Sequence, residues 1–103
     1  MGKIRYGATP THPGEVLKDE ILYRKISQSK LAVQMGISYK VLNDILNERR
    51  PLTTTTAMLF EAALDVPADA MMRMQLKYNM QIASNDKTLA ARLEKVRQMV
   101  AML

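Results

Sequence analysis

The segment between Ser27 and Asn47, SQSKLAVQMGISYKVLNDILN, constrains the fold of this chain more than any other. Its apolar residues recur at helical spacing in two short stretches, 28–35 and 39–47, and each stretch follows a serine that can cap a helix. Gly36 lies between them, and glycine adopts the positive φ of a sharp turn at little steric cost. The segment therefore predicts two short helices that meet at a tight corner.

The second of these helices has two chemically different faces. Its apolar stripe, at helical spacing, consists of Val41, Leu42, Ile45 and Leu46. The opposite face is rich in hydrogen-bonding groups and consists of Lys40, Asn43, Asp44 and Asn47, with Tyr39 on its flank. Such a face suits a helix that enters the major groove of DNA, although an ordinary hydrated surface has a similar composition. The spacing of Gln28, Ala32, Gly36 and Ser38 favours the DNA-binding interpretation.

The remaining helices follow from similar start and stop signals. The sequence HPGE opens a helix that runs to about Arg24, because proline is tolerated in a first helical turn. Three more helices are predicted: one starting at 53–56, one over 68–83 and one over 88–103. No segment alternates as a strand would. The chain is therefore predicted to be all-α, with a flexible arm at 1–10, a five-helix domain at 11–83 and an additional C-terminal helix within 84–103.

Composition narrows the classes of function. The chain has no cysteine, which removes disulfides, zinc–thiolate sites and thiol catalysis. Its only histidine, His12, is interpreted as a helix-entry residue, and no glycine-rich phosphate loop or apolar span of membrane length is present. We therefore expect neither an enzyme nor a membrane protein, and no cofactor.

Charge is unevenly distributed along the chain, which has a net charge of +5. Residues 1–56 contain nine Lys and Arg against five acids, whereas residues 57–86 contain two against four. A basic first half suits a phosphate-facing region backed by a packing region, although solvated charge without a partner gives the same pattern.

Several motifs carry a family resemblance. The positions of Gln28, Leu31-Ala32, Gly36, Ile37-Ser38, Leu42 and Ile45 resemble the helix-turn-helix of the lambda-repressor-like (XRE) family. HPGEVL, SYKVLNDILNERRPLTT and EAALDVPADAMMRMQLKYNMQIA resemble the HigA-type antitoxins over about residues 11–83. The resemblance implies a five-helix lambda-repressor-like domain. That family usually has glycine where Asp65 stands, so a left-handed backbone there is expected to cost about 1 kcal/mol relative to glycine.

The resemblance also implies a function. It predicts a homodimeric antitoxin of a HigBA-like module that binds a palindromic double-stranded DNA operator, represses its own operon and neutralises a HigB-type, mRNA-cleaving toxin. Its location would be cytoplasmic, and nucleoid-associated when bound to DNA. A stand-alone XRE-family repressor and a helical adaptor that never binds DNA remain as alternatives.

Position within the helix-turn-helix assigns the DNA contacts. The base-reading residues are predicted to be Ser38, Tyr39, Lys40, Asn43 and Asp44. Lys40 suits guanine, Asn43 suits adenine, and Asp44 can accept from a cytosine amino group. The phosphate contacts are predicted to come from Gln28, Lys30, Arg49, Arg50 and the backbone N–H groups near Thr53 and Thr54.

The second half of the chain is predicted to pair two copies. Dimerisation is assigned to apolar residues of the helix over 68–83, Met71, Met74, Leu76 and Met80, with closure of the monomer core as the alternative. The last helix carries a heptad seam formed by Leu89, Leu93, Val96, Val100 and Leu103. So short a seam must dock on its own domain, the sister subunit or a toxin.

Overall fold

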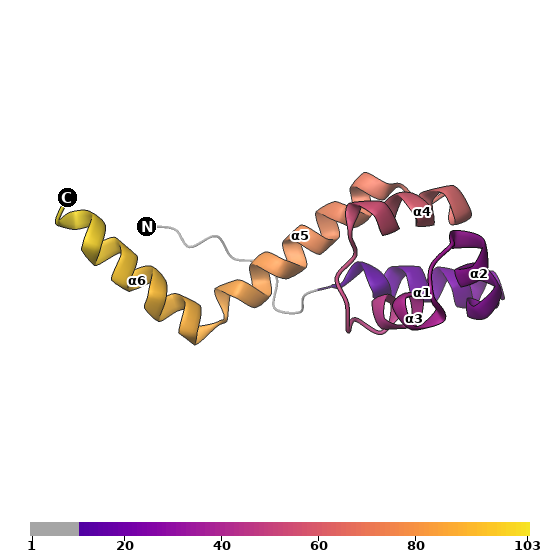
Figure 1. The fold of residues 1–103 in the computed structure, drawn as a ribbon, viewed down its shortest axis with the longest axis horizontal. Coiled ribbons are helices and arrows are strands. Elements are labelled where there is room, and N and C mark those ends of the chain that lie inside the picture. The colour runs from indigo at the N-terminus through magenta and orange to yellow at the C-terminus, as the bar shows by residue number, and fades with distance from the viewer. Residues whose placement is uncertain (1–10) are drawn as a thin grey trace. The chain divides into compact units, whose positions relative to one another are not determined.

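The computed structural model describes residues 11–103, and every regular element in this part of the chain is a helix (Figure 1). The helices are α1 (Pro13–Tyr23), α2 (Gln28–Met35), α3 (Tyr39–Leu46), α4 (Thr54–Leu64), α5 (Ala68–Ser84) and α6 (Lys87–Ala101). The all-α prediction and the order of the helices are confirmed. The predicted arm, residues 1–10, lies outside the described residues.

The described residues form two compact units, 11–76 and 77–103, and α5 runs from the first into the second. The first unit contains α1 to α4 and the start of α5. This division falls inside α5, and the expected domain boundary at residue 83 remains a prediction. The candidate site lies wholly within the first unit.

Side chains next to the starts of α1, α2 and α3 supply acceptors for N–H groups in the first turn of each helix. The hydroxyls of Ser27 and Ser38 accept from backbone N–H groups at 3.3 and 3.1 Å, as the sequence predicted. The start of α1 uses His12, whose Nδ1 accepts from the Gly14 N–H at 2.9 Å. The interpretation of His12 as a helix-entry residue is therefore confirmed.

The helix ends depend on left-handed backbone. Gly36 has φ 70°, which confirms the predicted corner between α2 and α3. Asp65 ends α4 at φ 58°, so the expected left-handed conformation at this position is also present. Two further left-handed residues, Lys25 and Glu48, follow α1 and α3 and were not predicted. A non-glycine residue bears a steric cost in this conformation.

The core of the first unit lies between α1, α2, α3 and α4. Its members come from these helices, from the α3–α4 connection and from the start of α5: Leu17, Ile21, Leu31, Ala32, Met35, Leu42, Ile45, Leu46, Leu52, Ala57, Phe60, Leu64 and Met71. At Gly14, α1 lies so close to the Ile45 carbonyl of α3 that a Cβ would overlap it. In the segment that follows α3, the Leu52 N–H donates to the buried Gln75 side chain of α5 at 2.7 Å. These contacts fix α3 and the segment that follows it.

The second unit has a different character. The seam residues Leu93, Val96 and Val100 of α6 are exposed in the described chain, and so is Leu103, which follows the helix. No helix among residues 11–103 is long and apolar enough to cross a bilayer.

Candidate nucleic-acid interface

The α3 helix turns its apolar stripe into the core and its polar face outward. Leu42, Ile45 and Leu46 are buried, whereas Tyr39 is about half exposed and the Lys40 side chain is 80% exposed. The predicted two-faced helix is therefore present. Its polar face can reach a macromolecular partner without any change in the core.

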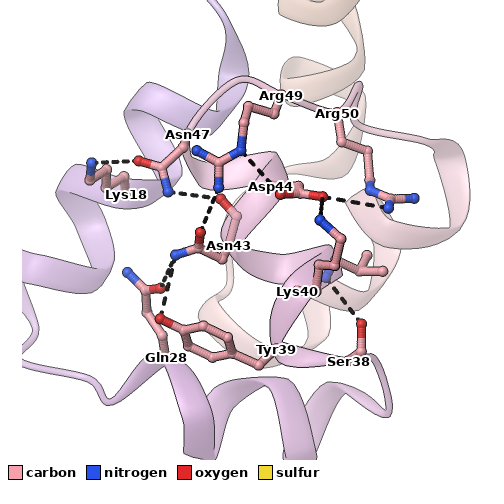
Figure 2. A network of polar contacts seen from close by, with 11 residues as sticks. Lys18, Gln28, Ser38, Tyr39, Lys40, Asn43, Asp44, Asn47, Arg49 and Arg50 are labelled. Carbon is pink, nitrogen blue, oxygen red and sulfur yellow. Dashed lines mark hydrogen bonds and ion pairs between the residues drawn. The ribbon is translucent and has the colours of Figure 1, made fainter.

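Asp44 is the exception on that face, because only 10% of its side chain is exposed. Its carboxylate accepts from Lys40 Nζ and Arg49 Nε, each at 3.2 Å, and lies 3.6 Å from an Arg50 guanidinium nitrogen (Figure 2). The hydrogen bond from Lys40 is the main reason why the pKa of Asp44 lies below its ordinary value. Burial opposes this shift, and Arg49 adds to it. Both oxygens of the predicted base-reading carboxylate are thus already engaged by cations.

Asn43 forms the second part of the network. Its side-chain oxygen accepts from Arg49 at 2.7 Å, and its side-chain nitrogen donates to Gln28 Oε1 at 3.2 Å (Figure 2). Tyr39 lies at the edge of this network, with its hydroxyl 3.5 Å from the Asn43 nitrogen. Gln28, which was predicted to contact phosphate, therefore holds a predicted base-reading residue as well.

Lys18 and Asn47 extend the network and were not among the predicted site residues. Lys18 Nζ donates to Asn47 Oδ1 at 2.9 Å, and the Asn47 side-chain nitrogen donates to the Asn43 carbonyl at 2.9 Å. The polar spacing of α3 already indicated Asn47. Nothing local indicated Lys18, because its partner lies 29 residues further along the chain.

The chain turns back just after α3, and this turn brings Arg49 and Arg50 next to the helix. Glu48 is left-handed, its N–H donates to the Ile45 carbonyl at 3.1 Å, and the Arg49 N–H donates to the Asp44 carbonyl at 2.8 Å. This pair of bonds is a Schellman motif, which reverses the chain direction after a helix. The reversal places the guanidinium groups of Arg49 and Arg50 beside Asp44 (Figure 2).

His12 joins the start of α1 to this segment. Besides its bond with Gly14, it shares a backbone hydrogen bond with Arg50. Burial lowers the pKa of His12 below its ordinary value, while the Glu48 carboxylate and the Arg50 bond act in the opposite direction.

The remaining predicted phosphate contacts differ in availability. Lys30 is exposed in the first turn of α2. The Thr53 N–H donates to Thr56 Oγ1 at 2.9 Å within a capping box, so this predicted anion donor is already engaged. Thr54 is the first residue of α4, where N–H groups lack partners within the helix. The available backbone donor is therefore at Thr54 rather than at Thr53.

The predicted dimerisation residues also separate into two groups. Met71 is 7% exposed and belongs to the monomer core, so its assignment to a pairing surface requires correction. Met74 is partly buried against the same core. Leu76 and Met80, by contrast, are 61% and 44% exposed. The alternative of core closure thus applies to the first two residues.

The described site combines a helix-turn-helix with a cationic, hydrogen-bonding outer face. Lys18, Lys40, Arg49 and Arg50 contribute four positive charges to this face, and the last three of them pair with the Asp44 carboxylate. Such an arrangement defines a class of protein that presents a short helix to a polyanion.

The chain belongs to the XRE-type helix-turn-helix family, whose model matches residues 17–71. It is 32% identical over 77 residues to virulence-associated protein I of Dichelobacter nodosus, in an alignment that covers 74% of this chain and 71% of that protein. The predicted family resemblance is confirmed.

Solved structures extend the similarity to HigA-type antitoxins. The Pseudomonas aeruginosa antitoxin HigA, solved with the higBA promoter, is 30% identical with a TM-score of 0.70, covering 87% of this chain and 94% of that one. An addiction module antidote protein of the HigA family from Coxiella burnetii is 29% identical with a TM-score of 0.69, covering 84% and 92%.

Proposed function

We propose that this protein binds double-stranded DNA sequence-specifically by placing α3 in the major groove. The observation that carries the proposal is the outward polar face of α3, where Lys40 and Asn43 are held beside two folded-back arginines. Lysine suits the O6 and N7 acceptors of guanine, and asparagine can bond adenine at two atoms. Ser38 and Tyr39, both exposed at the start of α3, complete the proposed base-reading set.

Phosphate contacts would position this helix. Arg49 and Arg50 keep 58% and 44% of their side chains exposed while paired with Asp44, so they can also meet the DNA backbone. Lys30 in the first turn of α2, Gln28 beside it and the Thr54 N–H supply further contacts on the same unit. Phosphate contacts of this kind fix the register of a helix on the duplex without reading sequence.

The proposed biological role is that of an antitoxin in a HigBA-like module, located in the cytoplasm. One reading helix contacts too few base pairs for useful specificity, so the protein would act as a homodimer on a palindromic operator with half-sites roughly 34–36 Å apart. Exposed Leu76 and Met80 of α5 and the seam of α6 are the proposed pairing surfaces. Similarity to HigA-type antitoxins supports autorepression and neutralisation of an mRNA-cleaving toxin of the HigB type.

The test of DNA binding compares substitutions on α3 with one elsewhere. Lys40→Ala and Asn43→Ala should each weaken binding to the region upstream of the gene by about tenfold or more, since one good base contact contributes on the order of 1–3 kcal/mol of discrimination. Arg73→Ala removes a positive charge from an exposed side chain of α5 and is the matched control. Footprinting should give two protected patches on one face of the duplex. Equal binding by all three variants, without steep salt dependence, would contradict the proposal and favour an adaptor.

The toxin partner needs a separate experiment. Co-expression with a neighbouring reading frame should yield a stable complex and relieve growth arrest caused by that frame alone. DNA binding without any such partner would instead indicate a stand-alone repressor.

A further inference from the structure

We propose that Asp44 is a positioning residue of the DNA-reading surface, which holds Lys40, Arg49 and Arg50 in one cluster before DNA arrives. This inference rests on the proposed DNA binding and replaces the expected contact between Asp44 and cytosine. It assigns to the carboxylate a role in specificity without contact with a base.

The Asp44 carboxylate is buried, whereas the cationic side chains that it binds are exposed. The Asp44 side chain is 10% exposed, whereas the side chains of Lys40, Arg49 and Arg50 are 80%, 58% and 44% exposed. One carboxylate oxygen binds Arg49, and the other faces Lys40 and Arg50 (Figure 2). A base edge would have to displace these cations to reach the carboxylate. The cations, by contrast, can meet DNA while they remain paired.

The backbone reinforces this arrangement. Arg49 donates two hydrogen bonds to Asp44. Its backbone N–H donates to the Asp44 carbonyl at 2.8 Å, and its Nε donates to the carboxylate at 3.2 Å. A terminal guanidinium nitrogen of Arg49 then donates to Asn43 at 2.7 Å. The orientation of Asn43, a proposed base-reading side chain, is thereby linked to Asp44 through Arg49.

Two physical consequences follow. Side chains that are already held lose less conformational freedom when the complex forms, which favours the one DNA geometry they fit. The carboxylate also cancels one positive charge, which lowers attraction to DNA of any sequence. Both effects raise the ratio of operator binding to non-specific binding.

The variant Asp44→Asn tests both consequences. An amide keeps the size of the side chain but loses the charge, and it can no longer accept from all three cations. We expect operator affinity to fall about tenfold while affinity for a scrambled duplex rises about twofold to fivefold, with a salt slope steeper by at most about one phosphate contact. Asp69→Asn, which removes an exposed carboxylate paired with Arg73, is the matched control and should leave the ratio unchanged. Fluorescence anisotropy with the full chain measures the affinity of the native protein and of each variant for both duplexes.

Four outcomes distinguish the hypotheses. The proposal predicts that Asp44→Asn weakens preference at every base pair of a half-site to a similar degree. Lost preference at a single base pair would overturn it and restore direct reading by Asp44, and an unchanged ratio would overturn it as well. If the native chain itself shows no operator preference, the proposed DNA binding fails, and this inference fails with it.

A measurement on the native protein without DNA tests the proposal even if the Asp44→Asn variant fails to fold. In the free native protein, NMR relaxation should show the Arg49 Nε–H to be as ordered as the backbone, and Arg92 in α6 to be mobile. Equal mobility of both arginines in the native chain would contradict a preformed cluster, whatever the variant does.

Discussion

Replacing Gly14 by alanine should destabilise the protein, even though alanine normally favours a helix by about 1 kcal/mol over glycine. The added Cβ would overlap the backbone carbonyl of Ile45 and crowd His12 Nδ1 at 2.9 Å. A carbonyl inside α3 cannot rotate away as a side chain does, so α1 and α3 must separate. Overpacking of this kind typically costs about 1–3 kcal/mol. After the helix preference of alanine is subtracted, we expect a net loss of up to about 2 kcal/mol.

Gly36→Ala is the matched control for this prediction. Nothing lies within 4 Å of a Cβ at Gly36, so that variant bears only the left-handed strain at φ 70°, about 1 kcal/mol. Urea unfolding followed by circular dichroism at 222 nm gives both values. If Gly14→Ala proves as stable as the native chain or more so, the close approach of α1 to α3 is wrong. Because this contact also supports the end of α3, the same variant should weaken DNA binding.

Two further predictions concern His12 and Asp65. Burial depresses the pKa of His12 in the folded state, so the unfolded chain takes up the proton more readily, and stability should fall as pH drops below about 6.5 and level off once the folded pKa is passed. Urea midpoints between pH 5 and 7.5 measure this loss of stability. The variant His12→Asn, which keeps a capping acceptor, should abolish it. If the variant shows the same dependence of stability on pH, His12 is not its cause. At Asp65, with φ 58°, glycine should raise the free energy of unfolding by about 0.5–1 kcal/mol and valine should lower it. A valine variant as stable as the native chain would contradict the left-handed assignment.

Local chemistry explains why much of the fold could be predicted. The hydroxyls of Ser27 and Ser38 cap α2 and α3 because the backbone N–H groups that donate to them lie only three residues further along the chain. The turn at Gly36 depends on the backbone conformation of that residue alone. The apolar stripe of α3 follows from helical spacing alone. Such features need no knowledge of distant residues.

The parts that escaped prediction depend on contacts between distant residues or on unusual backbone. Glu48 adopts a left-handed φ without glycine, and the resulting chain reversal brings two arginines over Asp44. The helical spacing of α3 places Asp44 on the solvent-facing side and gives no sign that two arginines cover it. Met71 likewise fits either a core or a pairing surface by spacing, and only the packing of the first unit decides.

The connection between α3 and α4, residues 47–53, is held to the rest of the first unit at two points. Near its start the arginines are tied to Asp44, and just beyond Pro51 the Leu52 N–H is bonded to buried Gln75. Most surface loops accept extra residues during evolution, but lengthening this one would sever an attachment that the interior needs. New operator preferences are therefore more accessible by exchanging Tyr39, whose side chain takes part in neither attachment, than by changing the length of the loop.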